Sequence, residues 1–144
     1  MKHQPSKTLV RFGVTMESGL LERFDRWVAS QGLSSRSRAL RDIVRDKLVS
    51  DEWEFGEAVT IATINLVYDH HKPNLQALLT SIQHDHIDQI VSTLHVHLDH
   101  DNCLEVLVVR GEAKEIKAIA DKLITCKGVR HGKLNVTTTG ENLK

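Results

Sequence analysis

The residues with the clearest capacity for chemistry are histidines and one cysteine in the second half of the chain. Five of the nine histidines lie within residues 84–100, and Cys103 follows shortly after them. His95 and His97 are two residues apart, so on a β-strand their imidazoles project from the same face. The opposite face, which we expect to be turned toward the core, then carries Leu94, Val96 and Leu98.

Cys103 would lie across a tight turn on the next strand, where its side chain can return toward the two imidazoles. Two nitrogens and a thiolate favour a transition metal over calcium or magnesium, which prefer oxygen. Three ligands leave a coordination position open, and its candidate ligands are His84, His86 and His100. The spacing is compatible with square-planar Ni(II) or Cu(II) and with tetrahedral Zn(II).

The elements around these residues are predicted from hydrophobic periodicity. Alternation and β-branched residues predict strands over 59–68, 90–99, 103–110 and 132–139, and helical spacing predicts helices over 73–82 and 112–126. Gly111 is expected to break the third strand, and Gly128 to end the second helix. The resulting order, β-α-β-β-α-β, is the ferredoxin-like arrangement, so we expect an α+β protein.

The first half of the chain predicts one strand and two helices. Val10–Met16 alternates apolar and polar residues, Ser18 is placed to cap a helix, Gly32 to end it, and a second helix begins near Ser35. A unit of roughly 45 residues is near the lower limit for a stable core, and a lone strand leaves its backbone groups unpaired. Both problems disappear if two copies pair their strands into an antiparallel ribbon over four helices.

Such a ribbon fits the major groove of B-DNA, where its outward side chains can contact base edges. The outward positions are Arg11, Gly13 and Thr15. Ser35 and Arg36, at the start of the second predicted helix, are placed to contact a phosphate. The first half is therefore predicted to bind double-stranded DNA.

The charge distribution supports different tasks for the two halves. Residues 1–50 contain ten Lys/Arg and five Asp/Glu, a balance of +5, whereas the remainder contains nine and fourteen, a balance of −5. A basic half favours a polyanionic partner. The absence of a long apolar run or a secretory leader predicts no membrane association. Two cysteines form no disulfide framework, which favours a reducing cytoplasm.

The chain resembles two related groups of proteins. The order of its first half resembles the ribbon-helix-helix DNA-binding family. The combination of this first half with three motifs of the second half is similar to the nickel-responsive transcriptional regulators of bacteria and archaea, over about residues 9–140. The three motifs are Q-H-D-H, S-T-L-H-V-H-L-D-H-D-N-C-L-E-V and K-G-V-R-H-G-K-L. The resemblance implies a ribbon-helix-helix domain over residues 1–54 and an ACT-like nickel-binding and tetramerisation domain over residues 55–144.

The resemblance also implies a metal site, an assembly and a role. One square-planar Ni(II) per subunit would be held by His95, His97 and Cys103 of one subunit and His84 of another. Glu105 and Tyr68 match positions that support this site and its neighbouring helix. The assembly would be a homotetramer, a dimer of dimers. It would act as a cytoplasmic regulator, expected to be a repressor, that binds operator DNA when nickel is plentiful.

Two positions depart from the family pattern. The family commonly holds a second cation, such as potassium, between its two halves with a Glu and an Asp. Asp42 matches the Asp, but Arg38 replaces the Glu, and a guanidinium would repel the cation or take its place. We therefore expect weak or absent dependence on a monovalent cation. In the predicted DNA-contacting strand, Gly13 takes the place of a residue that is usually polar in the family. The sequence therefore does not define which operator sequence the protein prefers.

Three other classes of protein fit these sequence features less well than a regulator does. A metal carrier without a sensing role would leave the basic first half incidental. An antitoxin-like ribbon-helix-helix protein would have a toxin-binding second half, usually disordered, whereas this one predicts a folded sandwich. An enzyme is not expected, because no glutamate is evidently placed as a general base beside a metal-bound water. Alternation places Glu105 on the Cys103 face, where it would support a ligand instead.

Overall fold

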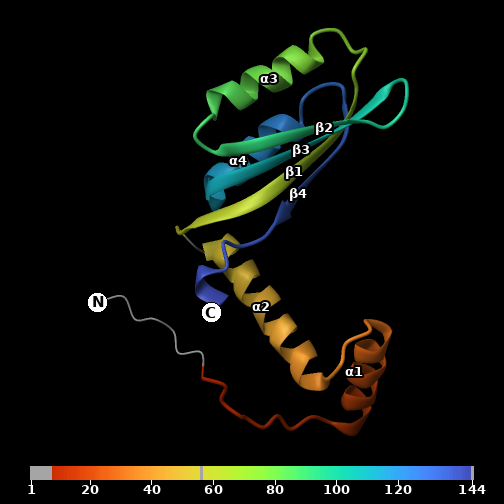
Figure 1. Cartoon of the computed structure of the whole chain (residues 1–144), viewed down its shortest axis with the longest axis vertical. Helices are drawn as coiled ribbons and strands as arrows, with labels where there is room; N and C mark the ends of the chain where they lie inside the picture. The colour runs from red at the N-terminus through yellow and green to blue at the C-terminus, as the bar shows by residue number, and fades with distance from the viewer. Residues whose placement is uncertain (1–7, 56, 144) are drawn as a thin grey trace. The chain divides into compact units, whose positions relative to one another are not determined.

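The computed structural model describes residues 8–55 and 57–143 (Figure 1). The described residues separate into two compact units: one lies within residues 49–139, and the other comprises residues 8–48 together with 140–143. The division falls between residues 48 and 49, whereas the sequence interpretation placed it between 54 and 55. The assignment of DNA binding to the first domain and nickel binding to the second stays a prediction.

The unit of residues 49–139 is built around one four-stranded antiparallel sheet. Its strands are β1 (Val59–Asp69), β2 (Ile90–His97), β3 (Asn102–Glu112) and β4 (Val129–Val136). They lie in the order β2-β3-β1-β4, as Figure 1 shows, with α3 (Leu75–Asp85) and α4 (Ala113–Ile124) completing the β-α-β-β-α-β sequence. This is the predicted order, and the unit is α+β and consistent with an ACT-like domain.

One face of the sheet is covered by the two helices and forms the core. Every second residue of β1 and of most of β3 is buried, as expected for strands with one covered face. Leu79 of α3 and Leu123 of α4 belong to the same buried cluster as the covered face of β1. Burial of each such side chain contributes roughly 1.5–3 kcal/mol. A capping box between Glu112 and Glu115 starts α4.

The covered face also carries the histidines of β2, which corrects the sequence interpretation. His97 pairs with Cys103 and His95 with Glu105, and both of these partners are buried on the covered side. The leucines predicted to face the core are instead exposed: Leu94 by 59% and Leu98 by 52%. The prediction was wrong because alternation groups residues by face without indicating which face the helices cover.

Two glycines lie inside strands instead of at their ends. Gly111, predicted to break the third strand, pairs with Thr60 within β3. Gly132, predicted to begin the last strand, lies in the middle of β4, opposite Leu66. A Cβ at Gly132 would lie 2.6 Å from Cγ1 of Ile124, so the residue allows the end of α4 to approach the strand closely.

The other unit contains α1 (Ser18–Ser30), the first part of α2 (Arg36–Phe55), and a short 3-10 helix (Glu141–Leu143). Glu17, not Ser18, is the N-cap of α1, so that capping prediction was wrong. Gly32 has a φ of +65°, as expected for the residue that ends the first helix. The backbone N–H of Arg38 donates to the Ser35 hydroxyl at 3.2 Å, which caps α2.

Residues 8–17 form no strand in the single chain. Their apolar side chains are strongly exposed: Leu9 by 84%, Val10 by 82% and Phe12 by 77%. A two-stranded ribbon requires a second copy to supply the hydrogen-bonding partner. The predicted strand over Val10–Met16 therefore stays a prediction.

Among the helices of the described residues, none combines the length and the apolar character needed to cross a bilayer.

Substitution of Gly132 tests the close contact between α4 and β4. We expect Gly132→Ala to lower the free energy of unfolding by about 1–3 kcal/mol, because the added methyl overlaps Ile124 in a packed core. Urea denaturation followed by circular dichroism measures this loss. Gly19→Ala is the control: its Cβ meets no atom within 4 Å on helix α1, so stability is unchanged or slightly raised. Equal stability of the parent and Gly132→Ala would contradict the packing described.

Candidate functional site

Strand pairing brings a thiol and several imidazoles to one end of the sheet. Cys103, near the start of β3, lies opposite Tyr68 of β1 on one side and His97 of β2 on the other. Because directly opposed residues of antiparallel strands share a face, all three side chains belong to the covered side. His70 follows the end of β1 and approaches the same thiol.

The thiol contacts two imidazoles. Sγ of Cys103 lies 3.4 Å from Nδ1 of His97 and 3.4 Å from Nδ1 of His70. The ligand atoms of these three residues all lie within 4.8 Å of one another. Cys103 is fully buried, His70 is half-buried and His97 is exposed, so the group opens from the core toward solvent. This donor set suits a borderline transition ion such as nickel.

His70 was not among the predicted site residues. It is 33 positions from Cys103 along the chain, and the pairing of Asp69 with Asn102 at the ends of β1 and β3 brings the two together. The signal in the sequence was a histidine two positions after the end of a predicted strand. It becomes informative only when that strand is placed beside the cysteine-bearing one.

The predicted ligand His95 lies next to His97 but apart from the thiol group. The ring centroids of His95 and His97 are 5.0 Å apart, and Nδ1 of His95 is 3.5 Å from the Tyr68 hydroxyl. The compact group around Cys103 contains His70 instead of His95. Of the predicted trio, the structure therefore brings His97 and Cys103 into contact, with His95 beside them.

The remaining histidine candidates lie elsewhere. His84 is exposed in the last turn of α3, and no hydrogen bond joins it to the thiol group within the described residues. Nε2 of His86 lies 3.2 Å from the Lys122 ammonium. His100 belongs to a separate, exposed group with His71 and Asp101.

Burial controls the protonation of the thiol. Removal from water raises the pKa of Cys103, and the negative charges of Asp99, Glu105 and Asp69 raise it further. Without metal, the neutral thiol is therefore favoured. A metal ion requires the thiolate, so binding at this residue releases a proton.

A buried carboxylate links α3 to the strands beside His95. Glu105 is only 6% exposed, and its two oxygens accept hydrogen bonds from the Gln83 amide at 2.6 Å and the Tyr68 hydroxyl at 2.9 Å. Burial, and then the bond to Glu105, raises the pKa of Tyr68, so the phenol keeps its proton and donates it. The Thr93 hydroxyl donates to the Gln83 carbonyl oxygen at 3.1 Å. These bonds fix the hydroxyl that faces His95.

The predicted DNA-contacting residues are all exposed in the first unit. Arg11, Gly13 and Thr15 belong to the exposed segment before α1. Arg36 forms a bidentate ion pair with Asp25, with two bonds of 2.7 Å, and this pair lowers the pKa of Asp25. A phosphate would therefore compete with Asp25 for the Arg36 guanidinium.

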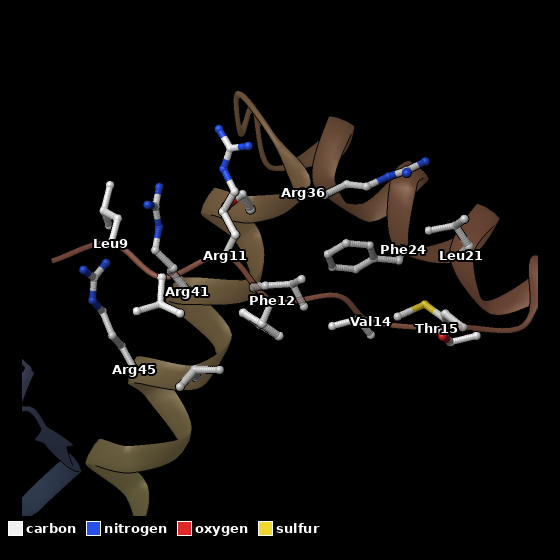
Figure 2. Close-up of a pocket in the computed structure, with 15 residues that line it drawn as sticks. Leu9, Arg11, Phe12, Val14, Thr15, Leu21, Phe24, Arg36, Arg41 and Arg45 are labelled. Atoms are coloured by element: carbon white, nitrogen blue, oxygen red, sulfur yellow. The ribbon is translucent and has the colours of Figure 1, made fainter.

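A groove of about 1270 Å³ lies between the segment before α1 and the two helices (Figure 2). Its apolar lining includes Phe12, Val14, Phe24 and Leu40. Four arginines also contribute to its lining: Arg11, Arg36, Arg41 and Arg45. Figure 2 shows Arg11, Arg41 and Arg45 toward the same end of the groove.

Arg38 and Asp42, at the positions where the family commonly holds a second cation, form an ion pair with each other. Nε of Arg38 lies 3.2 Å from Oδ2 of Asp42, one turn further along α2. Nη1 of Arg45 lies 3.3 Å from the other oxygen of the same carboxylate. Asp42 is thus already in contact with two guanidinium groups, both on its own helix.

Comparisons with known proteins match this part of the chain to a nickel-binding family. Residues 61–137 match the family model described as the NikR C terminal nickel binding domain. A relative from Geobacter metallireducens is 57% identical over 93% of this chain and 96% of its own. A relative from Pyrococcus horikoshii is 49% identical over 94% of this chain and 98% of its own. Both carry the name of a nickel-responsive regulator, not of an enzyme.

A solved structure shows likeness of fold alone. An uncharacterized protein from Thermotoga maritima aligns with a TM-score of 0.51 and 16% identity, covering 56% of this chain and all of that one. Sequence identity and the family model go further, because they span the strands that carry His97, Cys103 and Glu105. The chain therefore belongs to the family of nickel-responsive regulators that carry the NikR C-terminal nickel-binding domain.

Proposed function

We propose that this protein is a cytoplasmic transcriptional repressor that binds operator DNA when its second domain holds Ni(II). The observation that supports this most strongly is the buried thiol of Cys103, which contacts His97 within the region matched by the nickel-binding family model. A thiolate with imidazoles suits Ni(II), whereas calcium and magnesium prefer oxygen ligands. Bound nickel supplies a divalent charge that joins side chains from different elements.

We assign one nickel ion per subunit to His95, His97 and Cys103 with His84 of the partner subunit. Support for the first three comes from their common face on adjacent strands. Support for His84 comes from its exposure at the end of α3, where it is accessible to another copy. His70, already in contact with the thiol, is the competitor for the place assigned to His95.

A second copy is needed to complete the DNA-binding unit. The exposed apolar side chains before α1 and the apolar groove beside them form a surface that a partner could cover. Pairing of two segments over Val10–Met16 would cover this surface and point Arg11 and Thr15 outward. The guanidinium groups along the groove would then supply contacts to phosphates.

The second unit offers another surface for self-association. The open face of the sheet carries apolar side chains, among them the exposed Leu94 and the half-buried Val96, Leu104 and Val106. A sheet with one uncovered apolar face favours contact with another protein surface. Two such contacts, one in each unit, are the minimum needed for a dimer of dimers, and we assign the protein a homotetrameric state.

The proposed mechanism is thermodynamic linkage. If His84 from one subunit completes the site of another, nickel occupancy and the arrangement of subunits form one equilibrium. An arrangement that lets two DNA-binding dimers contact one operator raises affinity through effective concentration, without new base contacts. The network of Gln83, Glu105 and Tyr68 supports this linkage, because it connects the helix of His84 with the strand of His95.

Loss of individual ligands tests the nickel assignment. Replacing a residue that only supports a ligand lowers metal affinity about 10–100-fold, so we expect His97→Ala and Cys103→Ala to lower nickel affinity at least about 100-fold. Equilibrium dialysis measures the affinity, and sulfur-to-nickel charge-transfer absorption reports the thiolate. The absorption band should vanish in Cys103→Ala. His131→Ala, which alters an exposed histidine of β4, is the control.

Two further variants identify the remaining ligands. His84→Ala should weaken nickel binding while the thiolate band remains visible at high nickel. If His95→Ala binds nickel like the parent and His70→Ala does not, the ligand set is the compact group seen around Cys103, and the assignment of His95 is wrong.

Gel-shift measurements with operator DNA test the regulatory role. We expect nickel to raise the affinity of the parent by about tenfold or more, the usual scale of coupling between two sites. Cys103→Ala should lose this response but keep weak, salt-sensitive binding, because phosphate contacts do not require nickel. Arg11→Ala should weaken binding with or without nickel. An affinity for DNA that is the same in both states would leave a metal carrier as the better description.

Exchange of monovalent cations tests the consequence of Arg38. Because the guanidinium groups of Arg38 and Arg45 already contact Asp42, we expect nickel-dependent DNA binding to be equal in potassium and in tetramethylammonium salts of the same ionic strength. Arg38→Glu is the matched variant, in which potassium should strengthen binding. A parent protein that requires potassium would contradict this account.

A further inference from the structure

A second group of metal-ligand residues lies outside the thiol site. His71 follows β1 in the chain, and His100 and Asp101 form the turn between β2 and β3. Their ligand atoms all lie within 4.8 Å of one another, and all three residues are exposed. We propose that His71, His100 and Asp101 form a second binding site for a divalent transition-metal ion such as Ni(II) or Zn(II).

The distances suit a single ion. Nδ1 of His100 lies 3.0 Å from Oδ1 of Asp101, and Nε2 of His71 lies 3.6 Å from the same oxygen. Ligands about 2.1 Å from a metal lie ~3.0 Å apart at a right angle and ~3.4 Å apart at a tetrahedral angle. The three side chains therefore need only small adjustments to surround an ion. Two imidazoles and one carboxylate favour zinc, nickel or iron over magnesium, and leave positions for water.

The segment that carries His71 is hydrogen-bonded to the backbone of Asp101 through the neighbouring residue His70. The backbone N–H of His71 donates to Oδ1 of Asp69 at 2.9 Å, and that of His70 donates to the carbonyl oxygen of Asp101 at 3.1 Å. The His71 ring also lies 3.2 Å from the carbonyl oxygen of His100. Segments distant in the sequence are thus held together without a metal.

The turn that carries the other two ligands is braced by Asp99 and Arg130. Oδ1 of Asp99 accepts the backbone N–H groups of Asp101 at 2.9 Å and Asn102 at 2.7 Å. Arg130 donates to the side chains of Asn102 at 2.6 Å and Asp69 at 3.2 Å, which joins the two segments. A site on braced segments loses less conformational freedom when it binds an ion.

This site and the thiol site use different side chains. His70 and His71 are neighbours whose ring centroids are 4.0 Å apart, yet His70 faces Cys103 and His71 faces Asp101. The three carboxylates of Asp69, Asp99 and Asp101 outnumber the one guanidinium, that of Arg130, which favours a cation at this edge of the sheet. The two groups can therefore each hold an ion, the inner one with sulfur and the outer one without.

Counting bound ions tests the proposal on the full chain freed of metal. Equilibrium dialysis against Ni(II) or Zn(II) should detect two ions per chain in the parent. His71→Ala and His100→Ala should each lose one ion, or weaken its binding at least about tenfold, while the sulfur-to-nickel absorption stays unchanged. His131→Ala, the matched control, should keep both ions. Cys103→Ser should show the reverse pattern, losing the absorption and keeping the outer ion.

The result that overturns the proposal is binding of the same number of ions with the same affinity by the parent, His71→Ala and His100→Ala. Neither readout involves DNA, so the outer site is tested independently of the regulatory role. Magnesium at equal concentration should not displace the outer ion, because imidazole ligands disfavour it. Displacement by magnesium would contradict the assigned class of metal.

Discussion

The pairing of β3 with its two neighbours is the constraint on which the candidate metal site depends. This register places Cys103 between Tyr68 and His97, on the face of the sheet that the helices cover. A shift of one residue would turn the side chains of a strand to the other face, and the thiol would leave the core. The sheet therefore fixes the backbone positions of Cys103 and His97 relative to each other. The buried residues that stabilise the fold, Leu66 and Leu107 among them, hold the same register.

Glu105 shows how the core accommodates a charge next to this site. A carboxylate removed from water is costly unless it is hydrogen-bonded, and here both oxygens accept a bond from a side chain. One donor, Gln83, belongs to α3, and the other, Tyr68, reaches His95. A change in the position of α3 would leave the carboxylate unsatisfied, so the network resists independent motion of helix and strand. This resistance gives the proposed linkage between His84 and the strand ligands a physical basis.

Sequence patterns predicted contacts between residues that are close along the chain better than contacts between residues that are far apart along it. The spacing of His97 and Cys103 spans one tight turn, so their contact follows from the hairpin alone. His70 meets the thiol only because β1 pairs with β3, and no local pattern reports that pairing. Alternation grouped Leu94 with Val96 correctly but could not indicate that the open face, not the covered one, carries them. Gly132 was taken as the start of a strand because its role, close approach of α4, is a tertiary contact.

Each unit of the single chain exposes an apolar surface that the proposed assembly would cover. The segment before α1 exposes Phe12 without a strand partner, and β2 exposes Leu94 on an uncovered face. Hydrophobic burial favours filling both surfaces with further copies of the chain. The proposed ligand His84, exposed on α3, would then have access to a metal site in another subunit. If metal binding and DNA binding are both completed by assembly, coupling between them needs no continuous path of contacts through one subunit. It needs only that nickel stabilise one arrangement of subunits more than another.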